Sequence, residues 1–254
     1  MKLFFRKYGK GKPLVILHGL FGQSDNWNTL AKQFGESGFE AFAIDLRNHG
    51  LSPHNPEWNY KVMAEDVLDV LGENDLDHAN IIGHSLGGKV AMRMALDHPT
   101  LVEKLIVVDI APKKYKQGHE DVIKALAAMN ISALSSRRDA EERLEALIRD
   151  NATRMLLLKN LYRKEDNSLA WRFNHDVITK KYKEVLAEIE GNPFTKPTLF
   201  ILGGNSKHVE EKDLKEASKL FPAMSSVTIP GAGHWVHAEK PEEFRDAALR
   251  FLSL

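Results

Sequence analysis

The stretch Gly83-His84-Ser85-Leu86-Gly87 fits the pattern G-x-S-x-G, with an apolar run, 80–82, before it and a segment of helical spacing, 89–92, after it. A nucleophilic serine needs this context, because the flanking glycines let a strand turn sharply into a helix and hold the hydroxyl exposed above a sheet. Chance alone would produce the pattern in roughly one chain in ten of this length. The motif therefore predicts a nucleophile at Ser85 only if the rest of the chain supplies a base, an acid and donors for an oxyanion.

Strand-like and helix-like segments alternate on both sides of this motif. Apolar runs typical of strands cover residues 2–8, 13–17, 40–45, 80–83, 105–109, 198–203 and 226–229. Segments with helical spacing cover residues 27–34, 60–71, 86–96, 210–221 and 241–252. Repeated strand–helix units with continuously apolar strands predict an α/β fold with a mostly parallel central sheet and helices on both faces. Gly9 and Gly11 separate the first two strands, which we expect to form an N-terminal antiparallel hairpin.

Residues 113–195 interrupt this alternation with helical periodicity and many charges. We therefore expect residues 1–112 and 196–254 to form the core, with residues 113–195 as a helical insertion. Helical segments inside it are expected to start after Ser136 and to cover 155–161 and 174–189. The apolar face of the first of these segments comprises Leu144, Leu147 and Ile148. An insertion after a strand end would cover the carboxyl edge of the sheet, where ligands bind in open α/β folds, so we interpret it as a lid.

The charge balance and the residue types that are missing narrow the class of protein. The chain has 254 residues, with 35 basic and 35 acidic side chains and no net charge when histidine is neutral, so nothing favours a nucleic acid or an anionic membrane as partner. The lack of cysteine excludes a disulfide framework, a thiolate nucleophile and a cysteine-ligated metal. Residues 1–7 have too few apolar positions for a signal peptide, and no run approaches about 20 apolar residues. We expect a soluble cytoplasmic protein.

The candidate for the base is His234, which follows Gly233 in a loop after the last predicted strand. Serine, then carboxylate, then histidine is one of the chain orders that serine triads use. His237, three residues later, is the alternative base. The other histidines are expected to be structural or solvated, and His84 stands at the variable position of the motif.

Two backbone N–H groups are expected to form the oxyanion hole. One belongs to Leu86, the residue after the nucleophile, and the other to Leu20 in the loop 18–22, with Phe21 as the neighbouring alternative. Read alone, this loop would be only a glycine-rich turn. Its place after an early strand, together with the serine and histidine candidates, favours the oxyanion role.

Taken in order, these motifs resemble the α/β-hydrolase superfamily along the whole chain, and more closely the small YbfF-type bacterial esterases. The stretches that carry the resemblance are 18–22, 45–52, 83–88, 109–112, 171–174, 203–206 and 231–241. The resemblance implies a serine hydrolase that cleaves carboxylic esters of short to medium acyl chains through an acyl-enzyme, with acyl-CoA thioesters as a further candidate substrate. Such a reaction requires no metal or cofactor. We expect a small-molecule ester or acyl thioester as partner, and a monomer or homodimer.

The acid is where the chain departs from the common superfamily pattern. Many members of the superfamily carry an aspartate in the turn after the strand that here covers 198–202. In this chain the turn reads Gly203-Gly204-Asn205-Ser206, so a hydroxyl replaces the expected carboxylate. The next acidic residues, Glu210 and Glu211, are poorly placed.

Asp109 is the alternative acid, because it ends the strand that follows the Ser85 unit. A carboxylate at the end of the apolar run 105–108 would be costly to bury unless it had a partner. Asp109 could also serve as the cap of a turn. We predict that it orients His234, so that Ser85, Asp109 and His234 form the catalytic set.

Residues around this set have less specific signals. Phe21 and Trp235 are predicted to line the acyl pocket, whereas Leu86 and Trp171 are expected to serve mainly in packing. Asp45 and Arg47 are interpreted as structural. Four basic residues of the insertion could meet a phosphate-bearing acyl carrier, although a solvated face is the simpler interpretation: Lys113, Lys114, Lys116 and Arg172.

Two other functions keep the same scaffold. One is a carbon–carbon bond hydrolase or a lyase that uses the same serine and histidine. The other is a non-catalytic ligand-binding protein, against which the complete set of catalytic residue types argues. A serine at position 85 excludes the dehalogenases and epoxide hydrolases, which place aspartate there.

Overall fold

The computed structural model describes residues 1–116 and 120–253, so residues 117–119 of the predicted insertion and residue 254 of the predicted core lie outside the described residues. Within the described chain, the main sheet has seven strands in the order β1-β3-β2-β4-β5-β8-β9. Their bounds are β1 Phe5–Tyr8, β2 Lys12–Leu17, β3 Phe39–Ile44, β4 Ala79–His84, β5 Val102–Val108, β8 Thr198–Gly203 and β9 Met224–Ile229. Every pairing beyond β1 is parallel, which confirms the predicted mostly parallel sheet.

The predicted N-terminal hairpin is wrong. β1 runs antiparallel to β3, with Phe5 opposite Ile44, while β2 lies on the other side of β3 and parallel to it. The residues of β2 from Leu14 to Leu17 are completely buried, so this strand needs neighbours on both edges and takes a place between β3 and β4. The glycine link at 9–11 therefore carries the chain across the end of β3 instead of folding it back.

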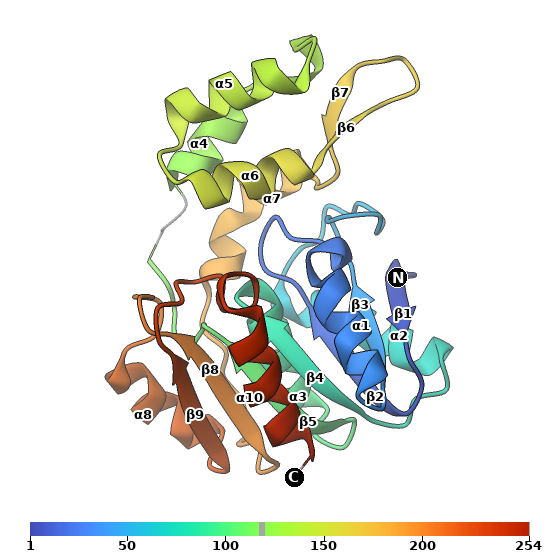
Figure 1. The fold of residues 1–254 in the computed structure, drawn as a ribbon, viewed down its shortest axis with the longest axis vertical. Coiled ribbons are helices and arrows are strands. Elements are labelled where there is room, and N and C mark those ends of the chain that lie inside the picture. The colour runs from blue at the N-terminus through green and yellow to red at the C-terminus, as the bar shows by residue number, and fades with distance from the viewer. Residues whose placement is uncertain (117–119, 254) are drawn as a thin grey trace.

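Helices cover both faces of the sheet, as predicted, and Figure 1 shows α1 and α10 together in front of it. The helices on one face are α1 Asn28–Glu36 and α10 Pro241–Ser253, and those on the other are α2 Tyr60–Glu73, α3 Leu86–Asp97 and α8 Glu211–Leu220. Two short turns of helix, η1 Ser24–Trp27 and α9 Val236–Glu239, precede α1 and α10. Because alternate strand residues face opposite sides, Ile16 joins the core under α1, whereas Leu17 joins the core under α2 and α3.

The chain between β5 and β8 forms a separate layer above the carboxyl end of the sheet (Figure 1). Its described elements are α4 Glu120–Ala128, η2 Ile131–Ala133, α5 Arg137–Leu147, α6 Asn151–Lys159, β6 Leu161–Arg163, β7 Leu169–Trp171, α7 His175–Lys181 and η3 Tyr182–Leu186. Ser136 caps α5 as predicted, by accepting the N–H of Asp139. The prediction for Leu147 is wrong, since its side chain is 47% exposed. The sequence also did not reveal the β6–β7 hairpin, whose strands are only three residues long.

A narrow neck joins this layer to the sheet, and we define the neck as residues 112–115 and 186–189. Its two segments are hydrogen-bonded side by side: Ile189 N–H donates to Pro112 O at 2.7 Å, and Tyr115 N–H donates to Leu186 O at 2.8 Å. Lys89 of α3 is bonded to both segments, because its ammonium donates to Lys113 O at 2.8 Å and to Ala187 O at 2.5 Å. The neck is thus tied to the helix that follows Ser85.

Candidate active site

Ser85 stands alone between β4 and α3, in the strand–turn–helix context that its motif requires. Its φ of 51° and ψ of −114° are unfavourable for a residue with a side chain. The backbone segments around this turn are in very close contact: a Cβ on Gly83 would lie 2.3 Å from Gly87 O, and a Cβ on Gly87 would lie 2.5 Å from Leu17 O. Both motif glycines are therefore required for the turn that projects the serine.

Asp109 lies beside His234 at the end of β5. Its Oδ2 accepts the Nδ1 proton of His234 at 2.7 Å, and the carboxylate is 1% exposed. Oδ1 accepts Gly203 N–H at 3.1 Å, and Oδ2 also accepts the hydroxyl of Ser206 at 2.5 Å. The turn that lacks the expected aspartate thus contributes a hydroxyl to the carboxylate on the neighbouring strand.

The loop that carries His234 is held from two sides. Glu239 accepts the N–H of Gly233 at 2.8 Å and that of Trp235 at 3.2 Å. His84 is the second support, because its Nε2 donates to the carbonyl of His234 at 2.9 Å. The residue at the variable position of the serine motif therefore fixes the histidine loop, a role that no sequence signal indicated.

With Nδ1 of His234 bonded to Asp109, the other ring nitrogen, Nε2, is the one available to a substrate or to the serine. Ser85 and His234 line one narrow cavity. His237, the alternative base, packs in the core: its ring stacks on Trp27 at 4.0 Å, and burial lowers its pKa to about 3. The structure therefore brings Ser85 together with His234 and gives His237 a packing role.

The predicted oxyanion donors flank Ser85. Leu86 is the first residue of α3, where a backbone N–H has no carbonyl within the helix to bond. Leu20 lines both cavities that Ser85 lines. The loop of Leu20 is fixed by His18, whose Nδ1 bonds Gly19 O at 2.8 Å and whose Nε2 accepts Leu46 N–H at 3.0 Å.

The two predicted substrate-binding aromatics line the narrow cavity with Ser85 and His234. Phe21 is held by Asn160, whose side-chain amide donates to its carbonyl at 2.7 Å. Trp235 also lines a wider cavity of about 240 Å³ next to α6 and α9. Trp171 packs instead on Phe173, with ring centroids 5.2 Å apart.

The sequence did not identify two residues that lie near the site. His208 stacks on the ring of His234, with centroids 3.7 Å apart and planes 16° apart. Its only sequence signal is its position two residues after Ser206. Lys89 lines a cavity with Ser85. Its sequence signal is its position in an otherwise apolar helix, one turn after the nucleophile.

Asp109, His208 and His234 present ligand atoms within 4.8 Å of one another, and metals such as Zn²⁺ bind these atom types. The nearly parallel stack of the two rings, however, keeps the in-plane lone pairs of their nitrogens from converging on one point. The 2.7 Å contact of Asp109 with His234 is a hydrogen-bond length. The arrangement fits proton transfer better than metal binding.

The four basic residues of the insertion do not form one patch. Lys113 forms an ion pair with Asp213 at 2.5 Å, and the guanidinium of Arg172 lies 4.8 Å from the ring centroid of Tyr162. Lys114 and Lys116 are exposed, and Lys116 lines a cavity with Ser85.

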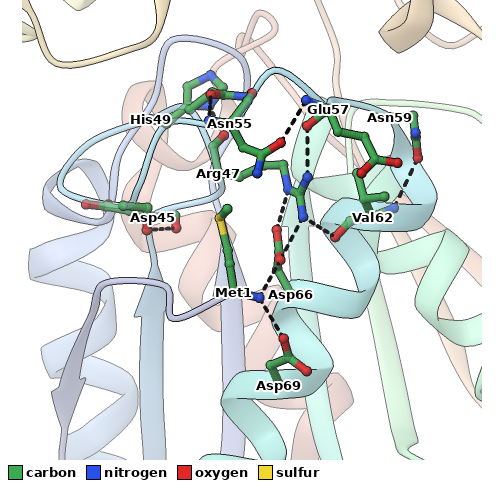
Figure 2. A network of polar contacts seen from close by, with 12 residues as sticks. Met1, Asp45, Arg47, His49, Asn55, Glu57, Asn59, Val62, Asp66 and Asp69 are labelled. Carbon is green, nitrogen blue, oxygen red and sulfur yellow. Dashed lines mark hydrogen bonds and ion pairs between the residues drawn. The ribbon is translucent and has the colours of Figure 1, made fainter.

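Asp45 and Arg47 are buried and take part in the polar contacts of the loop after β3 (Figure 2). Arg47 donates to Asp66 from Nε at 2.5 Å and from Nη2 at 2.8 Å, and Asp66 also accepts the amino group of Met1 at 2.9 Å. Asp45 accepts the N–H of Leu51 at 2.7 Å. These bonds hold the loop after β3, which agrees with the structural role that the sequence indicated.

Comparisons with known proteins place the chain among enzymes. Residues 12–241 match the alpha/beta hydrolase fold family. The chain is 38% identical over 248 residues to the sn-1-specific diacylglycerol lipase ABHD11 of Mus musculus, covering 94% of this chain and 80% of that protein. It is 36% identical over 242 residues to the esterase YbfF of Escherichia coli (strain K12), covering 95% of this chain and 93% of that protein. A solved marine microorganism esterase is 42% identical, with a TM-score of 0.96 and 99% of each chain covered.

Proposed function

We propose that this chain, a carboxylesterase of the α/β-hydrolase fold family, uses Ser85 as nucleophile, His234 as base and Asp109 as acid. The observation that carries the proposal is the 2.7 Å hydrogen bond from His234 to Asp109 beside the strained turn of Ser85. These residues follow three different strands; Ser85 and His234 line one cavity, and Asp109 is hydrogen-bonded to His234 behind it.

In the proposed mechanism, Ser85 Oγ attacks the carbonyl carbon of the ester while His234 Nε2 takes its proton. Asp109 holds His234 in the tautomer with hydrogen on Nδ1 and stabilises the imidazolium that forms. The N–H groups of Leu20 and Leu86 stabilise the oxyanion. His234 then protonates the departing alcohol, and water, deprotonated by the same histidine, releases the acid from the acyl-enzyme.

Turnover of p-nitrophenyl acetate and butyrate tests the role of Ser85. The Ser85→Ala variant is expected to lose about 10⁴-fold or more in kcat/KM, because it lacks the attacking oxygen. A variant that retains wild-type turnover would remove Ser85 from the mechanism. Failure of the wild-type protein to cleave either ester would instead favour the carbon–carbon hydrolase, lyase or ligand-binding alternatives.

The remaining sequence-based expectations extend this proposal. The layer between β5 and β8 acts as a lid, since α6 contributes Thr153 and Leu156 to the cavity of Ser85. Acyl-CoA thioesters are a second substrate class, which a panel of acyl lengths and acyl-CoAs would test.

No helix within the described ranges has the length and apolar character needed to cross a bilayer. Light scattering and cell fractionation would test the expected monomer or homodimer and its cytoplasmic location.

A further inference from the structure

The part of the chain that the structure describes forms two cavities that meet at Ser85 and have different linings beyond it. The narrow one, lined by His234, Trp235 and Leu156, lies next to the wide cavity of about 240 Å³ that also contains Trp235 and Leu156. The other, which we call the inner cavity, has a volume of about 80 Å³ and extends from Ser85 past Leu86 toward α2 and the neck.

The proposed mechanism, on which this inference rests, decides which part of the ester enters each cavity. His234 must protonate the departing oxygen, so the alcohol has to lie on the side of Ser85 that His234 lines. That side is the narrow cavity and the wide one beyond it. The acyl group then occupies the inner cavity.

The described walls of the inner cavity carry positive charge, and the acid that acts on this charge, Glu188, lies outside the residues that line the cavity. Among the described residues that line it are Lys89 and Lys116, and none of them is an aspartate or glutamate. Lys89 is 1% exposed. A buried ammonium is costly unless an anion or several acceptors compensate it.

Among the described residues, Lys89 has hydrogen-bond acceptors for two of its three N–H groups. Two of its three N–H groups donate to the neck carbonyls of Lys113 and Ala187, and the rings of Tyr60 and Tyr115 lie 5.5 and 4.9 Å from its nitrogen. The tyrosine hydroxyls are already used, because Tyr60 donates to Val185 O at 2.5 Å and Tyr115 donates to His208 O at 2.9 Å. The third N–H of Lys89 is therefore the charged donor that an acyl group in this cavity would meet.

We propose that the inner cavity selects short acyl groups that end in a carboxylate, and that Lys89 is the residue that recognises this carboxylate. Lys89 follows Ser85 by one helical turn and lines the same cavity of about 80 Å³, a volume that suits a short acyl chain of roughly four or five carbons. Burial lowers the pKa of Lys89 to about 7, and a bound carboxylate would favour its charged form. The substrates are then half-esters of short dicarboxylic acids.

Two esters of matched shape test this selection. Monoethyl succinate carries the carboxylate, and ethyl 4-methylpentanoate replaces it with an isopropyl group of the same shape. We expect the wild-type protein to have a kcat/KM for the half-ester roughly tenfold to a hundredfold above that for the neutral ester, measured in a pH-stat. A wild-type preference for the neutral ester would overturn the proposal.

Variants at Lys89 locate the preference. Lys89→Met should remove the preference for the half-ester, and Lys89→Arg should retain most of it. The ratio of the kcat/KM values for the two esters is compared within each variant, because this ratio cancels any general loss of activity caused by a loosened neck. Lys104→Met is the matched control, since Lys104 also donates to two backbone carbonyls, Phe251 O at 3.3 Å and Leu252 O at 3.1 Å, away from the inner cavity. An unchanged ratio in Lys89→Met would overturn the role of Lys89. Wild-type protein that cleaves p-nitrophenyl butyrate but neither of these esters would overturn the proposal and leave the proposed function standing, whereas inactivity on all three would contradict the proposed function itself.

Discussion

At the scale of single residues, the catalytic assignment depends on which side chain supports His234. Asp109 has a φ of 49°, a conformation that an ordinary side chain rarely adopts, and it follows the completely buried residues 105–108 of β5. Its carboxylate accepts hydrogen bonds from His234, Ser206 and the backbone of Gly203. A carboxylate held this firmly favours one tautomer and one orientation of the histidine ring.

Substitution of Asp109 and Ser206 should therefore have very different effects. Asp109→Asn is expected to lower kcat/KM for p-nitrophenyl butyrate by about 10⁴-fold, because the amide favours the wrong tautomer of His234. Ser206→Ala removes one hydrogen bond to the carboxylate and should cost about tenfold. The opposite ranking of the two variants would move the acid role to the turn at 203–206.

The sequence was informative about residues that belong to local motifs and less informative about their neighbours. Ser85 and His234 could be predicted because glycines mark the turns that carry them. Asp109 could be predicted because an acidic residue ended an apolar run. His208 and Lys89 could not, since their importance arises from a ring stack and from a cavity that only the packed chain creates.

At the scale of elements, the elbow between β4 and α3 depends on close backbone contact. Gly83→Ala should destabilise the fold by about 2–4 kcal/mol, because the added Cβ would lie 2.3 Å from Gly87 O and the backbone would have to move. Gly72→Ala in α2 is the control, since a Cβ there has no atom within 4 Å, and it should be neutral or stabilising by up to about 1 kcal/mol. Urea unfolding measures both. Equal stability of the two variants would show that the elbow tolerates a side chain.

Elements were predictable where burial imposed a pattern along the chain. Fully apolar runs such as Leu14 to Leu17 identified parallel strands, because both faces of those strands are covered. The partner of β1 could not be read from the glycines at 9 and 11, since such glycines permit a crossing as well as a hairpin turn. The β6–β7 pair was missed because three residues are too few to display an alternating pattern.

At the scale of the whole molecule, burial keeps several histidines neutral. It lowers the pKa of His18 to about 4 and that of His49 and His237 to about 3, and it also lowers that of His84. In the unfolded chain these side chains titrate near pKa 6.5. Below that pH the unfolded state binds protons that the native state does not, so stability falls with falling pH until the native pKa values are reached.

The melting temperature should therefore be lower at pH 5 than at pH 7.5. Each of these histidines contributes a slope of about 1.4 kcal/mol per pH unit below pH 6.5, and none above it. His237→Phe, which can keep the stack on Trp27, should flatten the dependence. His78→Phe should not, since His78 is exposed. A melting temperature that is constant between pH 5 and 7.5 would contradict this role of the buried histidines.

The most direct test of the triad as a whole is covalent labelling by a fluorophosphonate probe, followed by mass spectrometry of the intact protein and its peptides. We expect one adduct, on Ser85, that forms rapidly in the wild-type protein, much more slowly in Asp109→Asn and not at all in Ser85→Ala. An adduct on another residue, or no adduct on folded wild-type protein, would contradict Ser85 as the activated nucleophile.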